Sequence, residues 1–126
     1  QSHRVTGVID FGDAVRAPLI FDVAIAAAYL RSAGADPLEL IAPFVHAYQA
    51  IDPLEDVEIA LLFDLVRARL ATTITLLFWR LSARHDHDAY RQKTLDEEAD
   101  AVRFLEAVDA IGRVEFAERL VQATLR

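Results

Sequence analysis

Apolar residues along this chain follow two patterns, a short β-type pattern at the start and long helical patterns after residue 18. Val5, Val8 and Ile9 lie with Thr6 and Gly7 in a short β-prone stretch that stops at Phe11-Gly12-Asp13. This stretch predicts one short strand. The rest of the chain predicts five or six helices, and no low-complexity linker marks a second domain.

The segment 19–30 is apolar almost all round, which predicts a deeply buried helix that stops at Gly34. The tetrapeptide Asp-Pro-Leu-Glu then occurs twice, at 36–39 and at 52–55. An aspartate that can accept from free backbone amides, a proline at the first helical position and a glutamate three residues on are typical of a helix start. Two helices are therefore predicted to begin at Asp36 and Asp52.

No glycine or proline interrupts residues 54–84, so a long helix, or two helices that meet at a kink, is predicted there. At 100° per residue, one side carries a core-facing stripe of Leu62, Phe63, Val66, Leu70, Ile74, Leu77 and Leu81. The opposite side is small, polar and aromatic, and carries Asp64, Ala68, Ala71, Thr75, Trp79 and Ser82, with Arg67 at its edge. We expect another group to lie against this second face.

Two further helices are predicted at the C-terminal end of the chain. The first covers 89–110 and ends at Gly112, with a buried stripe of Leu95, Ala99, Val102, Leu105 and Val108. The second covers roughly 114–125. The predicted fold is mainly α and forms one domain over 1–126, in which 1–13 is the β segment and 18–126 is the helical subdomain.

Composition narrows the class of protein. With 54% hydrophobic residues in 126, and no apolar run long enough for a bilayer, we expect a globular chain without a membrane span. The net charge of −7 argues against nucleic-acid binding and against membrane attachment through a basic surface. The absence of cysteine excludes a disulfide framework, a thiolate nucleophile and a Cys-ligated zinc site, and it fits a cytoplasmic protein.

The segment from Asp10 to Asp13 carries the clearest chemical signal. An apolar strand that ends in Asp-Phe-Gly places a carboxylate at the strand end, and the glycine allows a tight turn. Mg²⁺ takes oxygen ligands and bridges nucleotide phosphates, so a fixed carboxylate is a component of phosphoryl-transfer sites. Asp10 is therefore a candidate metal ligand, and the alternative interpretation is an ordinary turn after a strand.

The residues 7–13, followed by Pro18-Leu19-Ile20-Phe21-Asp22-Val23-Ala24, resemble the aminoglycoside phosphotransferase and choline kinase group of small-molecule kinases. The later segment 51–69 is similar to the C-terminal helices of the hydroxylysine kinase branch. The resemblance implies the helical C-terminal lobe of a protein-kinase-like fold. It implies that Asp10 and Asp13 hold Mg²⁺, and that Asp22 supports the catalytic loop by hydrogen bonding. Ala17 departs from the family, in which many members have glycine before the proline.

The same resemblance implies components that these 126 residues do not contain. In the family, a nucleotide lysine and a His-Gly-Asp-x-x-x-x-Asn catalytic loop precede the Asp-Phe-Gly-Asp segment. Nine residues precede Asp10 here, and there is no methionine. We therefore expect a C-terminal fragment of a kinase, inactive alone, whose intact form transfers the γ-phosphoryl of ATP or GTP to a hydroxyl of a small molecule, with amine-bearing molecules among the candidate acceptors.

The resemblance also gives the second face of the long helix a role, because acceptors in the family bind between the catalytic loop and the C-terminal helices. Asp64 could hold an ammonium, Arg67 a carboxylate and Trp79 a cation or alkyl group, with Thr75 beside them. The alternative is a simple Asp64–Arg67 pair within one helix, with Trp79 in the core.

A non-enzymatic class competes with the kinase. In that interpretation the chain is an acidic helical module that dimerises or binds a partner through residues 21–30, and residues 10–13 are an ordinary turn. Fragment status also predicts a homodimer or aggregate, through apolar surface around Val5, Val8, Ile9 and the helix that contains Phe21.

Overall fold

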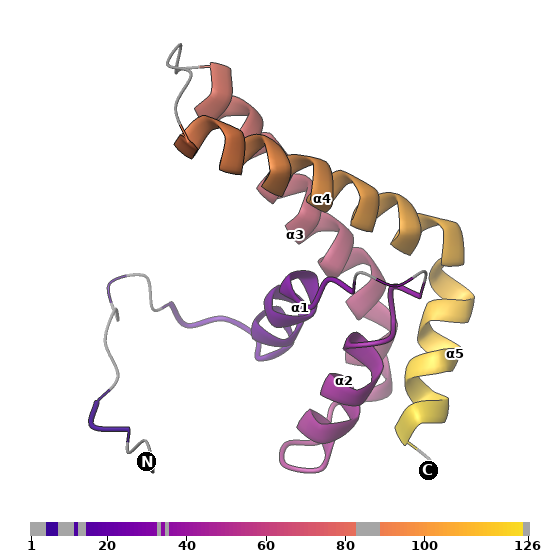
Figure 1. Ribbon diagram of the computed structural model, residues 1–126. Helices are drawn as coiled ribbons and strands as arrows, with labels where there is room; N and C mark the ends of the chain where they lie inside the picture. The colour runs from indigo at the N-terminus through magenta and orange to yellow at the C-terminus, as the bar shows by residue number, and fades with distance from the viewer. Residues whose placement is uncertain are drawn as a thin grey trace, which may run out of the picture.

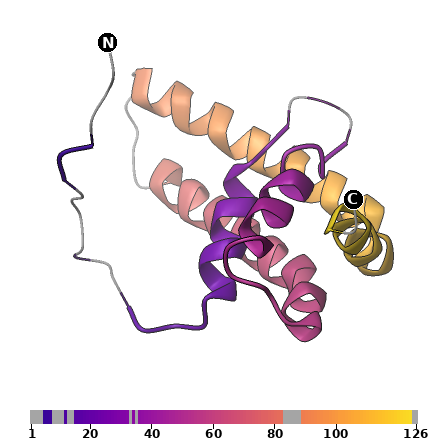
Figure 2. The ribbon, with the colours of Figure 1, turned by 90° about the horizontal axis from the view of Figure 1, so that it is seen from below.

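The computed structural model describes residues 5–7, 12, 15–32, 34, 36–82 and 89–124, and five helices account for most of them. The helices are α1 (Ile20–Tyr29), α2 (Ile41–Gln49), α3 (Asp56–Ser82), α4 (Ala89–Ile111) and α5 (Arg113–Thr124). Helices α3 and α4 run antiparallel as a long pair, while α1, α2 and α5 gather around the N-terminal half of α3 (Figures 1 and 2). The prediction of a mainly α fold is confirmed.

The predicted strand falls mostly on residues outside the described part of the chain. Residues 5–7 are described, and they are exposed and have no regular secondary structure. The β segment therefore stays a prediction.

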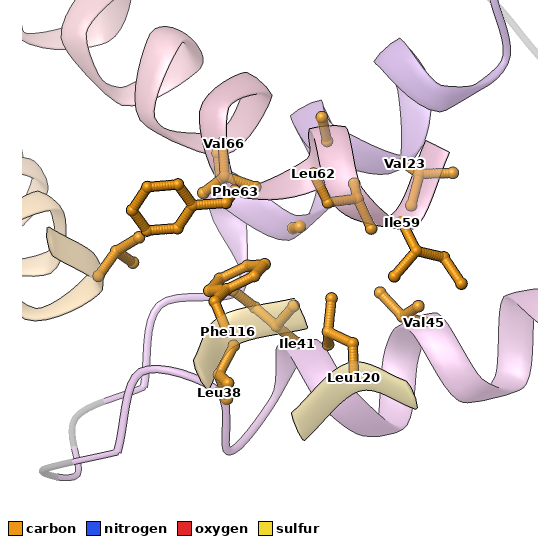
Figure 3. Close-up of a cluster of buried hydrophobic side chains, with 14 of the residues drawn as sticks. Val23, Leu38, Ile41, Val45, Ile59, Leu62, Phe63, Val66, Phe116 and Leu120 are labelled. Atoms are coloured by element: carbon orange, nitrogen blue, oxygen red, sulfur yellow. The ribbon is translucent and has the colours of Figure 1, made fainter. Parts of the chain in front are cut away.

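The core lies where α3 meets α1, α2 and α5. Figure 3 shows side chains of α3, among them Leu62, facing residues of α2 and α5. At the centre, the rings of Phe63 and Phe116 meet edge to face, with centroids 5.5 Å apart, and Phe116 is completely buried. Burial of apolar side chains is the main force that holds these four helices together.

Helix α3 is a single unbroken helix, and its predicted stripe faces the core. Leu62, Val66 and Leu70 have no exposed surface. The helix begins four residues after the predicted start at Asp52, because the carboxylate of Glu58, and not of Glu55, accepts from a free backbone amide, that of Glu55, at 2.9 Å.

The first Asp-Pro-Leu-Glu tetrapeptide forms a turn that precedes α2, so the predicted helix start at Asp36 is also wrong. The Asp36 carboxylate accepts from the backbone N–H of Leu38 at 3.0 Å, as a cap does. Glu39 accepts from the hydroxyl of Ser32 instead of bonding back to Asp36. Leu38 is buried in the core, which anchors this turn, and α2 begins only at Ile41.

Helix α1 has one buried face and one exposed face, which corrects the expectation that it is buried all round. Val23, Ala24, Ala27 and Ala28 are almost completely buried. The exposed fractions of Phe21, Ile25 and Tyr29 are 43%, 39% and 61%. An apolar face of α1 is thus open among the residues that the structure describes.

Helix α4 has the predicted bounds but a different buried face. Its buried residues are Thr94, Ala101, Phe104 and Val108, and of the predicted stripe only Val108 is among them. The spacing of seven residues from Thr94 to Ala101 to Val108 places small side chains against α3. The Thr94 hydroxyl donates to the Tyr90 carbonyl oxygen at 2.8 Å, so its burial leaves no unpaired donor. Gly112, at φ +77°, ends the helix as predicted.

Candidate functional site

The predicted metal ligands Asp10 and Asp13 lie outside the described residues, and Asp22 lies inside them. Asp22 is exposed in the first turn of α1, near the positive end of the helix dipole. Within the described part of the chain, its side chain makes no hydrogen bond or ion pair. Residues 15–18 lead from α1 away from the helical body (Figure 1). Asp22 therefore presents an exposed carboxylate at the N-terminal end of α1, which follows the Asp-Phe-Gly-Asp segment in the sequence.

The described residues contain no group of three or more histidine and acidic side chains that could hold a metal ion. They also include no helix with the length and apolar character that a bilayer crossing needs.

The predicted acceptor residues do not come together in one pocket. Asp64 pairs with Arg113 of α5, with one hydrogen bond of 2.8 Å, and Arg67 pairs with Asp109 of α4. The distance between the Asp64 and Arg67 charged groups is 3.9 Å, as expected for neighbours on one helix. Both side chains therefore tie α3 to the helices that follow it.

Thr75 and Trp79 lie further along the exposed side of α3. The Thr75 hydroxyl donates to the Ala71 carbonyl oxygen at 2.8 Å. The exposed fraction of Trp79 is 64%, which excludes the alternative that it is a core residue. None of the four predicted acceptor residues lines the cavities described next.

A cavity of about 460 Å³ lies where the C-terminal end of α1, the second half of α3 and α4 meet. We call it the arginine pocket, and it is lined by Tyr29, Arg31, Arg69, Thr73, Leu76, Leu77, Arg80, Glu97 and Asp100. A smaller apolar hollow of about 230 Å³ lies beside it, lined by Phe21, Ala24, Ile25, Leu65 and again Arg69. Arg69 thus separates an apolar hollow from a charged one.

The three arginines of the pocket differ in how far their charges are paired. Arg31 donates to the Ala28 carbonyl oxygen at 3.2 Å and pairs with Asp100 at 3.3 Å. Arg69 donates from Nη2 to the Tyr29 hydroxyl at 3.0 Å, and its guanidinium lies 5.6 Å from the centre of that ring. Its Nε is buried without a hydrogen-bond partner. Arg80 makes no ion pair or side-chain hydrogen bond with the described residues.

Sequence reasoning missed this pocket, although one of its walls was visible in the spacing. Residues 69, 73, 76 and 80 recur at three to four residues, which places them on one face of α3. Arg31 comes from the connection after α1, and only the tertiary structure brings it to that face.

The titratable groups with shifted pKa values lie on other elements. The Arg119 side chain, hydrogen-bonded to Asp36, lowers the pKa of that carboxyl, with the Leu38 amide helping and burial opposing. The same bond raises the pKa of Arg119. Burial raises the pKa of the Tyr48 phenol, and the nearby charges of Asp52, Asp22 and Glu58 raise it further. The Asp36–Arg119 pair joins the turn before α2 to α5, so its role is structural.

The N-terminal part of the chain is similar to a known protein family. Residues 1–59 match the phosphotransferase enzyme family, a match that includes Asp10, Asp13 and Asp22. No solved structure matches the chain.

Hydroxylysine kinases of three vertebrates are similar to the chain. The Danio rerio protein is 24% identical over 98% of this chain and 34% of its own length. The Mus musculus protein is 30% identical over 59% of this chain and 20% of its own length. The Xenopus laevis protein is 27% identical over 71% of this chain and 24% of its own length. The chain thus spans about a third or less of the curated relatives that it matches. The chain is similar to the phosphotransferase enzyme family over residues 1–59, and the resemblance to small-molecule kinases of the aminoglycoside phosphotransferase type, with hydroxylysine kinases among them, is confirmed.

Proposed function

We propose that these 126 residues form part of a Mg²⁺-dependent kinase that moves the γ-phosphoryl of ATP or GTP to a hydroxyl group of a small molecule. The match of residues 1–59 to the phosphotransferase enzyme family carries the proposal. Within that match, an Asp-Phe-Gly-Asp segment precedes a helix with an exposed aspartate in its first turn. The absence of cysteine supports a cytoplasmic location.

In this proposal Asp10 and Asp13 hold the metal ion. Two carboxylates supply the hard oxygen atoms that Mg²⁺ prefers, and the nucleotide phosphates complete its coordination. Bound there, the ion would neutralise charge on the transferring phosphoryl group. Asp22 would accept hydrogen bonds from the catalytic loop and so hold the loop in place, without contact to the reacting atoms.

Hydroxylysine is the acceptor to test first, because it carries a hydroxyl and two amines and is named in the relatives. Asp64, Arg67, Thr75 and Trp79 stay the proposed acceptor-binding residues, although two of them hold helices together here. Asp64→Asn in a longer protein that includes the catalytic loop should weaken acceptor binding and raise KM. An unchanged KM would remove Asp64 from the acceptor site.

The metal assignment is tested by Asp10→Asn and Asp13→Asn in that longer protein, with transfer of labelled phosphoryl from ATP or GTP as the readout. Loss of the metal ligand Asp10 should abolish activity over a range of Mg²⁺ concentrations. The matched control Asp96→Asn removes an exposed carboxylate of α4 that bonds only to Gln92 in the described residues, and it should retain activity. Equal activity in all three variants would contradict the metal assignment.

The 126 residues alone are predicted to be inactive, because they contain no catalytic base and no nucleotide lysine of the family type. A longer protein with the proposed activity should contain a His-Gly-Asp-x-x-x-x-Asn loop and a lysine-bearing strand in addition to these 126 residues. Mg²⁺-dependent transfer by the purified 126 residues would overturn this prediction.

The exposed face of α1 favours a second candidate, a helical module that pairs with a second copy. The apolar hollow is lined by Phe21, Ile25 and Leu65. Burial of these side chains against a second copy of the chain would be favourable through the hydrophobic effect. Sedimentation of the 126 residues should then show a dimer that Phe21→Ser weakens. A monomer at high concentration would exclude this candidate.

A further inference from the structure

We propose that the arginine pocket binds a small organic anion, a carboxylate or a phosphate monoester with an apolar body. The proposal does not depend on the phosphotransferase activity. It rests on the charges, the unpaired donors and the shape of the cavity, and none of the residues proposed above for metal or acceptor lines it.

The charge of the pocket is opposite to that of the chain. The chain has a net charge of −7, yet three arginines line this one cavity against two carboxylates. Those carboxylates are already engaged, since Asp100 pairs with Arg31 and Arg103, and Glu97 lies 3.7 Å from Lys93. Arg69 and Arg80 therefore have no acidic partner within the described part of the chain.

Of the three arginines in the pocket, Arg69 is the one with a buried N–H group, at Nε, that lacks an acceptor among the described residues. The desolvation of this donor is therefore not compensated by a hydrogen bond within the described part of the chain. Its only hydrogen-bond partner among the described residues is the Tyr29 hydroxyl, which is neutral. Two oxygens of a carboxylate or phosphate could each accept from an N–H group of the Arg69 guanidinium, and such paired bonds are among the strong ones.

The remaining walls specify an apolar body for the ligand. Leu76 and Leu77 of α3 line the cavity, and the Tyr29 ring lies under the Arg69 guanidinium. The Tyr29 hydroxyl accepts from Arg69 and keeps its own proton to donate to the ligand. A volume of about 460 Å³ is in the range of small-molecule sites.

Titration calorimetry of the 126 residues at low salt tests the proposal. Phenyl phosphate and benzoate are the two organic probes, inorganic phosphate is the anion without a body, and benzyl alcohol is the neutral probe. At least one organic anion should bind saturably, more tightly than inorganic phosphate, and benzyl alcohol should not bind. Tighter binding of phenyl phosphate or of benzoate identifies which anion the pocket prefers, and either result supports the proposal.

Three variants locate the site. Arg69→Gln should weaken binding about tenfold or more, because it removes a charged donor pair. Arg80→Gln should weaken it about threefold, because Arg80 is exposed and screened, and this variant removes no contact made by the described residues. Asp100→Asn should strengthen binding, since it releases Arg31 from its ion pair.

Arg113→Gln is the matched control, because it removes one arginine charge, as Arg80→Gln does, but from a residue of α5 that does not line the pocket. The affinity of this variant for the organic anions should equal that of the unchanged protein. The proposal is overturned if no probe binds saturably at millimolar concentration, if benzyl alcohol binds as well as the anions, or if Arg113→Gln weakens binding as much as Arg80→Gln.

Discussion

Phe116→Ala should remove most of the attachment of α5 to the rest of the molecule. Phe116 is completely buried, and Leu120 is the other fully buried residue among the described side chains of α5. Burial of a phenylalanine side chain contributes about 1.5–3 kcal/mol, and the edge-to-face contact with Phe63 adds about 0.5–1.5 kcal/mol. The cavity left between α2, α3 and α5 adds further loss, so we expect about 3–5 kcal/mol in total.

That loss is a large part of the 5–15 kcal/mol that stabilises an ordinary domain. Urea unfolding followed by circular dichroism measures it directly. Circular dichroism is the better probe because the single tryptophan, Trp79, is 64% exposed and would report poorly on the core.

Val114→Ala is the control in the same helix. Val114 is 70% exposed, so its truncation should change the free energy of unfolding by less than about 0.5 kcal/mol. A loss below about 1 kcal/mol for Phe116→Ala, or equal losses in the two variants, would show that α5 does not pack on the core as described.

Three further changes test local features of the fold. Gly112→Ala should destabilise by about 1 kcal/mol in thermal unfolding, because alanine is strained at φ +77° although no atom lies near its Cβ, and Gly112→Asn should cost less. Asp36→Asn should flatten the acid end of the stability profile. The folded pKa of Asp36 is lowered, so its stabilisation is complete above the unfolded value of about 3.8 and is lost as pH falls through the folded value; because the Arg119 and Asp36 side chains are 35% and 45% exposed, it is at most about 1 kcal/mol. Glu58→Ala should lower the stability by about 0.5–1 kcal/mol through loss of the bond from the Glu55 amide, whereas Glu58→Gln should retain most of it, as measured by urea unfolding.

The long helices were predictable, apart from the exact start of α3, because the residues within and directly after them determine most of their extent. No glycine or proline lies within α3, and the conformational freedom of Gly112 ends α4. The stripe of Leu62, Val66 and Leu70 faces the core because large apolar side chains at helical spacing form one face of the helix, and that face is most stable when it is buried.

The buried face of α4 was not predictable by the same rule. A prediction from the hydrophobic pattern depends mainly on large side chains, and it assigned Leu95 to the buried face. Leu95 is 39% exposed in the structure. The structure instead buries Thr94, Ala101, Phe104 and Val108. Which face of a helix is buried depends on the helices that pack against it, and the sequence of one helix does not determine this.

The candidate sites divide in the same way. The Asp-Phe-Gly-Asp segment is local and was visible as a pattern of residues, whereas the arginine pocket forms only when Arg31, from the connection after α1, meets Arg69 and Arg80 of α3. The face around Asp64 and Arg67 was predicted to have another group against it, but the pattern did not show that Asp109 and Arg113 of later helices pair with these two side chains. Long-range ion pairs decide which charges are left free, and they are absent from any local pattern.

The distribution of those ion pairs separates stability from binding in this molecule. On the side of α3 near α5, Arg67 and Arg113 form ion pairs with carboxylates of neighbouring helices, so replacing either arginine should lower the free energy of unfolding. On the face that lines the pocket, Arg69 and Arg80 have no acidic partner in the described chain, so replacing Arg80 should leave the free energy of unfolding nearly unchanged. Arg80 is exposed and solvated, so it needs no ion pair for the fold to be stable. A loss of affinity in Arg80→Gln at constant stability would therefore show that Arg80 contacts the bound anion, because the substitution leaves the packing unchanged.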